Sequence, residues 1–167
     1  RLTDRGHDTL GAEMTETILT RLGYSKNFVR RVAWIVKNHM RFHYFAQNGD
    51  ADERKWIRKE ARSGEFRDSQ IMREAWEQLA KVCAADVLGC GKPNAATDGT
   101  LAFGECMADL SLSMPVHTKD LNYDERVIEL AGKRAGEGLQ YLLQQVQNGV
   151  IPNEPDALYN ALDRKLR

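Results

Sequence analysis

The sequence predicts an all-α protein, and three observations lead to that prediction. Along most of the chain, apolar residues recur at intervals of three and four, which is the periodicity of an amphipathic helix. The only candidate strand outside a helical period, Val150-Ile151, is too short to form one. Glycine and proline residues separate the periodic segments, as turns between helices require. We therefore expect a helical bundle followed by a smaller helical C-terminal extension.

Composition bounds the classes of protein that are compatible with this fold. The 167 residues suffice for one domain, or for one domain with an extension. The 24 basic and 24 acidic side chains cancel, which argues against a protein that coats nucleic acid but leaves room for a local basic face. We find no secretory signal and no apolar run near the ~20 residues of a membrane span. The three cysteines lack metal-type spacing, so we expect reduced thiols in a cytoplasmic protein.

Two helices are expected at the start, after a polar loop over residues 1–6. The first covers about Asp8–Leu22, and Gly23 ends it. Its apolar stripe consists of Leu10, Met14, Ile18 and Leu22. The second covers Lys26–Met40, with Ser25 as its N-cap. One face of the second helix carries Phe28, Val32, Ile35, Val36 and His39. We expect residues 41–55 to be largely irregular.

Two more helices complete the first region, for which we predict the bounds 1–91. A short one covers about Asp52–Arg62. A longer one runs from Asp68 or Ser69 to about Leu88. The stripe of this longer helix consists of Ile71, Ala75, Leu79, Val82 and Asp86. An aspartate on such a stripe needs a partner, because an unpaired buried charge is costly.

Residues 92–167 are expected to form the helical C-terminal extension, after a break at Gly89, Gly91 and Pro93. A helix from about Thr100 to Ser113 is followed by a short one around Asp124–Ala131. A glycine-rich turn then leads to a helix that ends near Asn148. The last helix should be capped by Asn153, with Pro155 in its first turn and an apolar stripe that contains Leu158 and Leu162.

His7, His39 and Asp86 are the candidate metal ligands. Imidazole and carboxylate groups bind divalent first-row metals, and helices can present them from positions far apart in the sequence. Taken singly, each histidine is as readily explained by a hydrogen-bonded or partly exposed side chain. Asp86 taken singly is as readily the partner of an N–H group or an arginine. His43 and His117 fall in segments that we expect to be loop-like, and we assign them no role.

Basic residues cluster in three places and are candidate RNA contacts. The set that we single out is Arg30, Arg31, Lys37, Arg41, Lys133 and Arg134. A further basic group surrounds Trp56, but acidic residues interleave with it, as on a solvated charged face. Basic side chains with an aromatic neighbour can follow a phosphate backbone and stack on a base. No phosphate loop, nucleophile elbow or His-Glu-x-x-His motif accompanies them, and the catalytic residues remain unknown.

Two groups of segments carry a resemblance to a known family. The first group is Gly6-His7-Asp8, Gly11-Ala12-Glu13, Leu19-Thr20-Arg21-Leu22, Val36-Lys37-Asn38-His39-Met40 and Ala84-Ala85-Asp86-Val87-Leu88-Gly89. The second group is Lys119-Asp120-Leu121, Gly136, Leu142-Leu143, Val146 and Asn148-Gly149-Val150-Ile151-Pro152-Asn153. In this order, they resemble the HD domain and the helical tail of bacterial and phage tRNA nucleotidyltransferases (CCA-adding enzymes) and poly(A) polymerase-like proteins.

The resemblance implies that this chain is the C-terminal half of such an enzyme. The family's His-Asp dyad normally precedes the segment that His7 matches, and the nucleotidyltransferase domain lies further upstream; neither is found here. Thr118 stands where the family has a glycine, and the chain begins with Arg1 rather than Met. The parent enzyme would extend RNA 3′ ends with Mg²⁺ and ATP or CTP, while this part would contact RNA.

Two alternatives stay open. In the first, an HD-type subdomain hydrolyses phosphomonoesters or 2′,3′-cyclic phosphates, with a divalent transition metal held by His7, His39 and Asp86. Without the upstream dyad, that ligand set is incomplete. In the second, the chain is a non-catalytic helical interaction domain.

Overall fold

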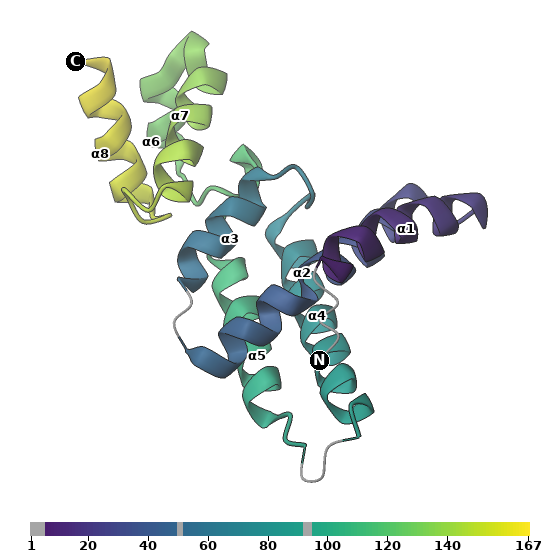
Figure 1. Cartoon of the computed structure of the whole chain (residues 1–167). Coiled ribbons are helices and arrows are strands. Elements are labelled where there is room, and N and C mark those ends of the chain that lie inside the picture. Colours follow the sequence, from purple (N-terminus) through teal and green to yellow (C-terminus); the bar gives the residue numbers. More distant parts are fainter. Residues whose placement is uncertain (1–5, 50–51, 92–94) are drawn as a thin grey trace. The chain divides into compact units, whose positions relative to one another are not determined.

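The computed structural model describes residues 6–49, 52–91 and 95–167, and these ranges are helical with no strand. Figure 1 labels the elements. The α-helices are α1 (His7–Arg21), α2 (Lys26–Asn48), α3 (Glu53–Arg62), α4 (Ser69–Gly89), α5 (Asp98–Leu112), α6 (Glu125–Ala131), α7 (Ala135–Gln147) and α8 (Pro155–Leu166). Two short 3₁₀ helices, η1 (Thr118–Asp120) and η2 (Gly132–Arg134), lie between α5 and α7. The all-α prediction is confirmed.

The chain divides into two compact units, each built from two stretches of sequence. Unit 1 consists of residues 1–51 and 74–108, and unit 2 of residues 52–73 and 109–167. The sequence suggests a single cut after residue 91, and the structure differs from that because α4 and α5 each contribute residues to both units. Glycine and proline residues mark where helices end. The units, in contrast, are defined by which helices pack together.

In unit 1, α1 and α2 form an antiparallel hairpin joined by a tight turn (Figure 1). Gly23 has φ 81°, a left-handed conformation that glycine adopts at no steric cost. The hydroxyl of Ser25 accepts a hydrogen bond from the Phe28 amide at 3.3 Å, as predicted for an N-cap. The expected irregular segment after Met40 is wrong, because α2 continues to Asn48 before Gly49 ends it with φ 65°.

The predicted stripe of α1 does not form a core. Leu10, Met14, Ile18 and Leu22 keep between 42% and 63% of their surface exposed. On the next helix, Phe28 is also exposed, in contrast to the other members of its predicted face. The side of α1 that packs on α2 is made of small residues instead: Ala12 is buried, and a Cβ on Gly11 would lie 3.1 Å from Val36. Close packing of the two helices there depends on these small side chains.

The interior of unit 1 is built by aromatic residues of α2 that meet α4 and α5. Trp34 packs edge-on against Trp76, with 5.1 Å between the ring centroids. Phe42 is fully buried and packs against Phe103, with 5.0 Å between the ring centroids. Gly104 of α5 lies so close to Ala80 of α4 that no Cβ fits between them. These contacts fix the last two turns of α2, where Phe42 lies, against the rest of the unit.

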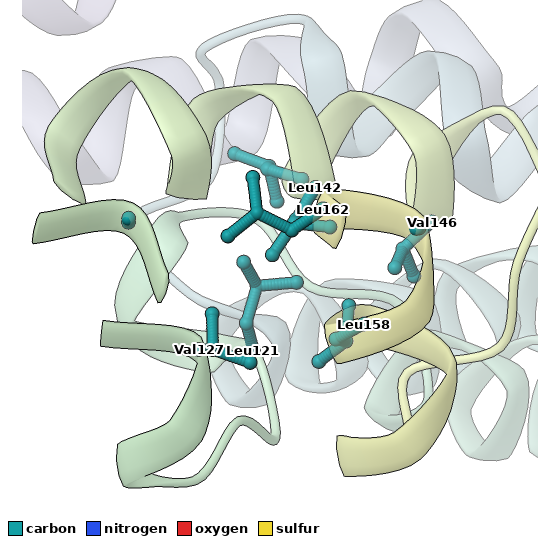
Figure 2. Packing of buried hydrophobic residues seen from close by; sticks show 9 residues of the cluster. Leu121, Val127, Leu142, Val146, Leu158 and Leu162 are labelled. Atoms are coloured by element: carbon teal, nitrogen blue, oxygen red, sulfur yellow. The ribbon is translucent and has the colours of Figure 1, made fainter. Parts of the chain in front are cut away.

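The last three helices of unit 2 enclose a core of aliphatic side chains (Figure 2). Val127 comes from α6, Leu142 from α7, and Leu158 and Leu162 from α8, and all four are at most 1% exposed. Leu121, which precedes α6, belongs to the same core. The stripe predicted for the last helix is therefore confirmed.

Asp52 and Asp68 cap the starts of α3 and α4, whereas the side-chain cap predicted for the last helix is absent. Asp52 accepts from the Lys55 amide at 2.8 Å, and Asp68 accepts from the Ile71 amide at 2.8 Å. The cap predicted at Asn153 is wrong, because the N-cap residue of α8 is Glu154. The Asn153 side chain is engaged in bonds to the segment before α6 instead.

Candidate functional site

The structure brings His7 and His39 together. His7 opens α1 and His39 lies in the middle of α2, and their Nε2 atoms are 3.1 Å apart. The Nδ1 atom of His39 lies 2.6 Å from the carbonyl oxygen of Val36. A carbonyl only accepts, so Nδ1 carries the hydrogen and the Nε2 lone pair of His39 points toward His7. Two arrangements fit this geometry. Either His7 donates a hydrogen bond from Nε2 to Nε2 of His39, or both Nε2 atoms face a cation.

Asp86 pairs with His43, a residue to which the sequence assigned no role. The Nε2 atom of His43 lies 3.1 Å from Oδ2 of Asp86. The His43 side chain is 11% exposed and that of Asp86 is 56% exposed. Sequence reasoning missed His43 because it placed residues 41–55 in a loop. Continued as a helix, α2 puts His39 and His43 one turn apart, and their ring centroids are 6.3 Å apart.

The three predicted metal ligands do not form one ligand set. Within the part of the chain that the structure describes, no three His, Cys, Asp or Glu side chains gather where they could hold a metal ion. A metal–nitrogen bond of ~2.0–2.1 Å nevertheless allows two imidazole nitrogens on one metal to lie ~3 Å apart. His7 and His39 therefore fit as two neighbouring ligands, and a metal site here remains a prediction.

Cys83 lies close to His39, and its thiol is unreactive. Its thiol is fully buried and points toward the carbonyl oxygen of His39, at 3.7 Å. Burial, with the Asp86 carboxylate nearby, raises the pKa of the Cys83 thiol to about 12. Because the thiolate is the reactive form, Cys83 serves as core packing rather than as a nucleophile.

A groove of about 400 Å³ lies between the last turns of α2 and the end of α4. Its polar lining comes from His43, Tyr44, Gln47, Asn48, Asp86 and Cys90. Met40 and Val87 contribute its apolar part. The groove exists because α2 extends beyond Met40: Tyr44, Gln47 and Asn48 all lie on the two turns that the sequence left irregular.

The predicted RNA-contacting residues are divided between the two units. In unit 1, Arg30 and Lys37 are exposed on α2, while Arg31 and Arg41 are half-buried. Arg31 donates to Oε1 of Gln78 at 3.1 Å, and the Arg41 guanidinium lies 5.3 Å from the centre of the Phe45 ring. In unit 2, Lys133 and Arg134 are exposed on η2. Their contact with RNA stays a prediction.

In unit 2, two of the segments singled out in the sequence hold each other. Asn153 donates through Nδ2 to the carbonyl oxygen of Asp120 at 3.0 Å, and its Oδ1 accepts from the Asn122 amide at 2.8 Å. The Asp120 carboxylate in turn accepts from the amides of Val116 and His117, at 3.0 and 2.9 Å. These bonds fix the chain before α6 against the turn before α8.

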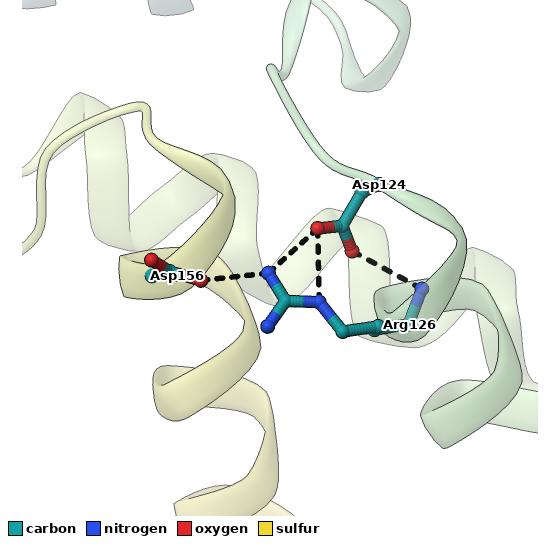
Figure 3. A network of polar contacts seen from close by, with 3 residues as sticks. All are labelled: Asp124, Arg126 and Asp156. Atoms are coloured by element: carbon teal, nitrogen blue, oxygen red, sulfur yellow. Dashed lines mark hydrogen bonds and ion pairs between the residues drawn. The ribbon is translucent and has the colours of Figure 1, made fainter.

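Salt bridges link α6 to α8 at the surface of unit 2 (Figure 3). The Nη2 atom of Arg126 lies 2.7 Å from Oδ2 of Asp124 and 2.6 Å from Oδ1 of Asp156. The hydrogen bond from Arg126 is the main cause that lowers the pKa of Asp124, and the Arg126 charge adds to it. All three groups are solvated, which marks this network as a surface contact rather than a reactive site.

Comparisons with known proteins leave the family open. A scan against protein-family models and searches of curated proteins and of solved structures each found no match. Among the described residues, none of the helices has the length and apolar character needed to cross a membrane.

Proposed function

We propose that this chain is the RNA-binding and HD-like helical region of an RNA nucleotidyltransferase of the CCA-adding or poly(A) polymerase-like type. The nucleotidyl-transfer chemistry, with Mg²⁺ and ATP or CTP, belongs to a domain outside these residues. This chain contributes contacts to the RNA backbone. It transfers no nucleotide by itself, because the resemblance places the nucleotidyltransferase domain upstream of these residues.

One observation carries the proposal: family-like segments that are far apart in the sequence contact each other. His7, of the Gly-His-Asp segment, meets His39, of the Asn-His-Met segment. In unit 2, Asn153 from the second group binds the backbone at Asp120. Chance resemblance of short segments would not require them to pack in pairs. The packing therefore supports a shared architecture.

The basic side chains give the proposal its binding surface. Arg30, Lys37 and Arg41 lie within two to three turns of α2 and project from overlapping sides of it, at 100° per residue. A single-stranded RNA that follows this side would place successive phosphates near them. Each cation that neutralises a phosphate releases a counterion, which makes the affinity depend on salt.

Charge reversal tests this role. We expect Lys37→Glu combined with Arg30→Glu to weaken the binding of single-stranded RNA at least tenfold, measured by fluorescence anisotropy with a labelled oligonucleotide. Lys81→Glu is the matched control, because Lys81 is also exposed on a helix of unit 1 but lies outside the predicted set. Equal affinities for the wild type, the double variant and the control would refute the binding role of α2.

The geometry of His7 and His39 favours a second candidate, a metal-dependent phosphohydrolase. His39 donates its Nδ1 hydrogen to a carbonyl, as metal-binding histidines commonly do, and its Nε2 faces that of His7. A metal held there would polarise a phosphoryl oxygen and activate water. The test is metal analysis after incubation with Mn²⁺, Co²⁺ or Ni²⁺. Stoichiometric metal that is lost in His39→Ala but kept in His117→Ala supports this candidate, and no bound metal in the wild type contradicts it.

A further inference from the structure

We propose that the groove between α2 and α4 binds one unpaired nucleobase, and that it prefers bases with an exocyclic amino group over uracil. The inference deepens the proposed RNA-binding function and rests on it. The groove volume of about 400 Å³ lies within the range of clefts that hold small molecules, ~300–1,000 Å³. Its lining offers the two features that base recognition needs, an aromatic face and hydrogen-bonding groups.

Tyr44 supplies the aromatic face. Its side chain is 53% exposed although it lines the groove. Lys37 and Arg41 precede it by seven and three residues, so all three side chains project from nearly the same side of α2. A strand whose phosphates lie along Lys37 and Arg41 reaches Tyr44 with a base. Stacking of bases on aromatic side chains next to a basic track is the usual way to bind single-stranded nucleic acid.

Asp86 supplies the preference for an amino group. A carboxylate only accepts hydrogen bonds, so the 3.1 Å contact between His43 Nε2 and Asp86 Oδ2 has His43 as the donor. No described residue donates to Oδ1, and the side chain is 56% exposed toward solvent and the groove. Oδ1 therefore accepts from the amino group of cytosine or adenine. Uracil presents the carbonyl oxygen O4 at the corresponding position and would repel the carboxylate.

The amides of Gln47 and Asn48 complete the set of polar groups. Both side chains line the groove and are exposed. Asn48 donates through Nδ2 to the Tyr44 carbonyl at 2.7 Å, which leaves its oxygen to accept from a ligand. An amide such as that of Gln47 both donates and accepts, so it can bind the ring nitrogens beside the amino group. The polar groups of the groove thus form hydrogen bonds with one edge of the base, while Tyr44 stacks on its face.

Nuclear magnetic resonance of the whole 167-residue chain tests the inference without any phosphate in the ligand. Cytidine, adenosine and uridine are titrated separately, and the side-chain amide signals of Gln47 and Asn48 are followed. We expect cytidine and adenosine to shift both signals and to bind at least fivefold more tightly than uridine. Absence of a shift at these residues, or equal binding of uridine, would overturn the proposal.

Matched variants locate the two contributions. Asp86→Asn should abolish the preference over uridine, because an amide can donate to O4, whereas Glu74→Gln on the same helix should leave it unchanged. Tyr44→Ala should weaken cytidine binding at least fivefold, whereas Tyr24→Ala, which removes another exposed tyrosine of unit 1, should not. Unchanged binding and preference in both Asp86→Asn and Tyr44→Ala would also contradict the assignment.

The two proposals fail in different ways. If charge reversal on α2 weakens RNA binding while nucleosides leave the groove unaffected, the RNA-binding function stands and the base site is wrong. If nucleosides bind in the groove with the expected preference, but charge reversal on α2 leaves the RNA affinity unchanged, the base site stands and the backbone contacts are wrong.

Discussion

Both the α1–α2 hairpin of unit 1 and the three-helix core of unit 2 contain helices with apolar residues at intervals of three and four. These residues are buried in unit 2 but exposed on α1. In α8, Leu158 and Leu162 are four residues apart and at most 1% exposed. In α1, Leu10 and Met14 are also four residues apart, and both are more than half exposed. The difference lies in the neighbours: α8 packs on both α6 and α7, whereas α1 packs on α2 through its small residues.

The comparison shows that periodicity predicts which residues share a face of a helix but not what covers that face. An apolar stripe is stabilising only where another element removes it from water, at about 25 cal/mol per Å² of apolar surface.

The largest effect is expected in the core of unit 2. Leu158→Ala removes a fully buried side chain and leaves a cavity, so it should lower the free energy of unfolding by about 2–5 kcal/mol. Met14→Ala, at a side chain that is 53% exposed, should change it by less than about 0.5 kcal/mol. Urea denaturation followed by circular dichroism measures both. Similar losses in the two variants would show that the stripe of α1 is covered in solution.

The cysteines of unit 1 give the next largest contrast. Cys90 and Cys106 are exposed and Cys83 is buried. Because the pKa of Cys83 is raised from 9.0 to about 12, its thiolate fraction at pH 8 falls roughly a thousandfold, and a thiol reagent should modify the other two first. Mass spectrometry of the labelled protein reads this directly. A raised pKa also means that Cys83 stabilises the fold below pH 9 and loses that contribution as the pH rises toward 12.

Labelling of Cys83 at the rate of the exposed cysteines would contradict a closed interior in unit 1. The control is the same reaction in urea, where all three thiols should react alike because the unfolded chain buries none of them.

A smaller effect is expected where α4 and α5 approach each other. In Gly104→Ala, the new Cβ would overlap the Cβ of Ala80, and the helices must separate, at a cost of about 1–3 kcal/mol. Gly99→Ala on the same helix meets no atom within 4 Å and should be neutral or slightly stabilising, because alanine favours a helix. Thermal unfolding of the pair measures the difference. A neutral Gly104→Ala would refute the close approach.

The smallest effect is expected at the surface network of unit 2. Arg126→Ala removes the bonds to Asp124 and Asp156 (Figure 3), but all three groups are solvated, so stability at pH 7 should hardly change. The pKa of Asp124 should return toward its ordinary value, because Arg126 is what lowers it. A group with a lowered pKa stabilises the fold only while it is ionised, so any difference between the two proteins should be lost as the pH falls through the pKa of Asp124.

Much of the fold could be predicted from local signals. Ser25, Asp52 and Gly23 mark helix ends through caps and a left-handed turn, and those ends were placed within a residue or two. The end of α2 was missed because Arg41–Asn48 carries few aliphatic residues. What holds those turns in place is the packing of Phe42 on Phe103, 61 residues away, which no local pattern reveals.

The candidate site could be predicted only in part, for the same reason. His7 and His39 were singled out as candidate metal ligands, and they do meet. Asp86 was expected to need a partner because its stripe would be buried, but its side chain is exposed. It pairs with His43, which became recognisable only once α2 was known to continue. The groove depends on side chains from two helices, and its Tyr44 and Gln47 carry no signal in the sequence that separates them from ordinary surface residues.

We propose that α2 binds the backbone of single-stranded RNA through Arg30, Lys37 and Arg41, which project from overlapping sides of the helix. The most direct test is the affinity of the chain for a single-stranded RNA as a function of salt concentration. Three neutralised phosphates predict a slope of about −2 in a plot of log affinity against log salt, at about 0.7 per contact on a single strand. A slope near zero, or no binding at low salt, would contradict the claim.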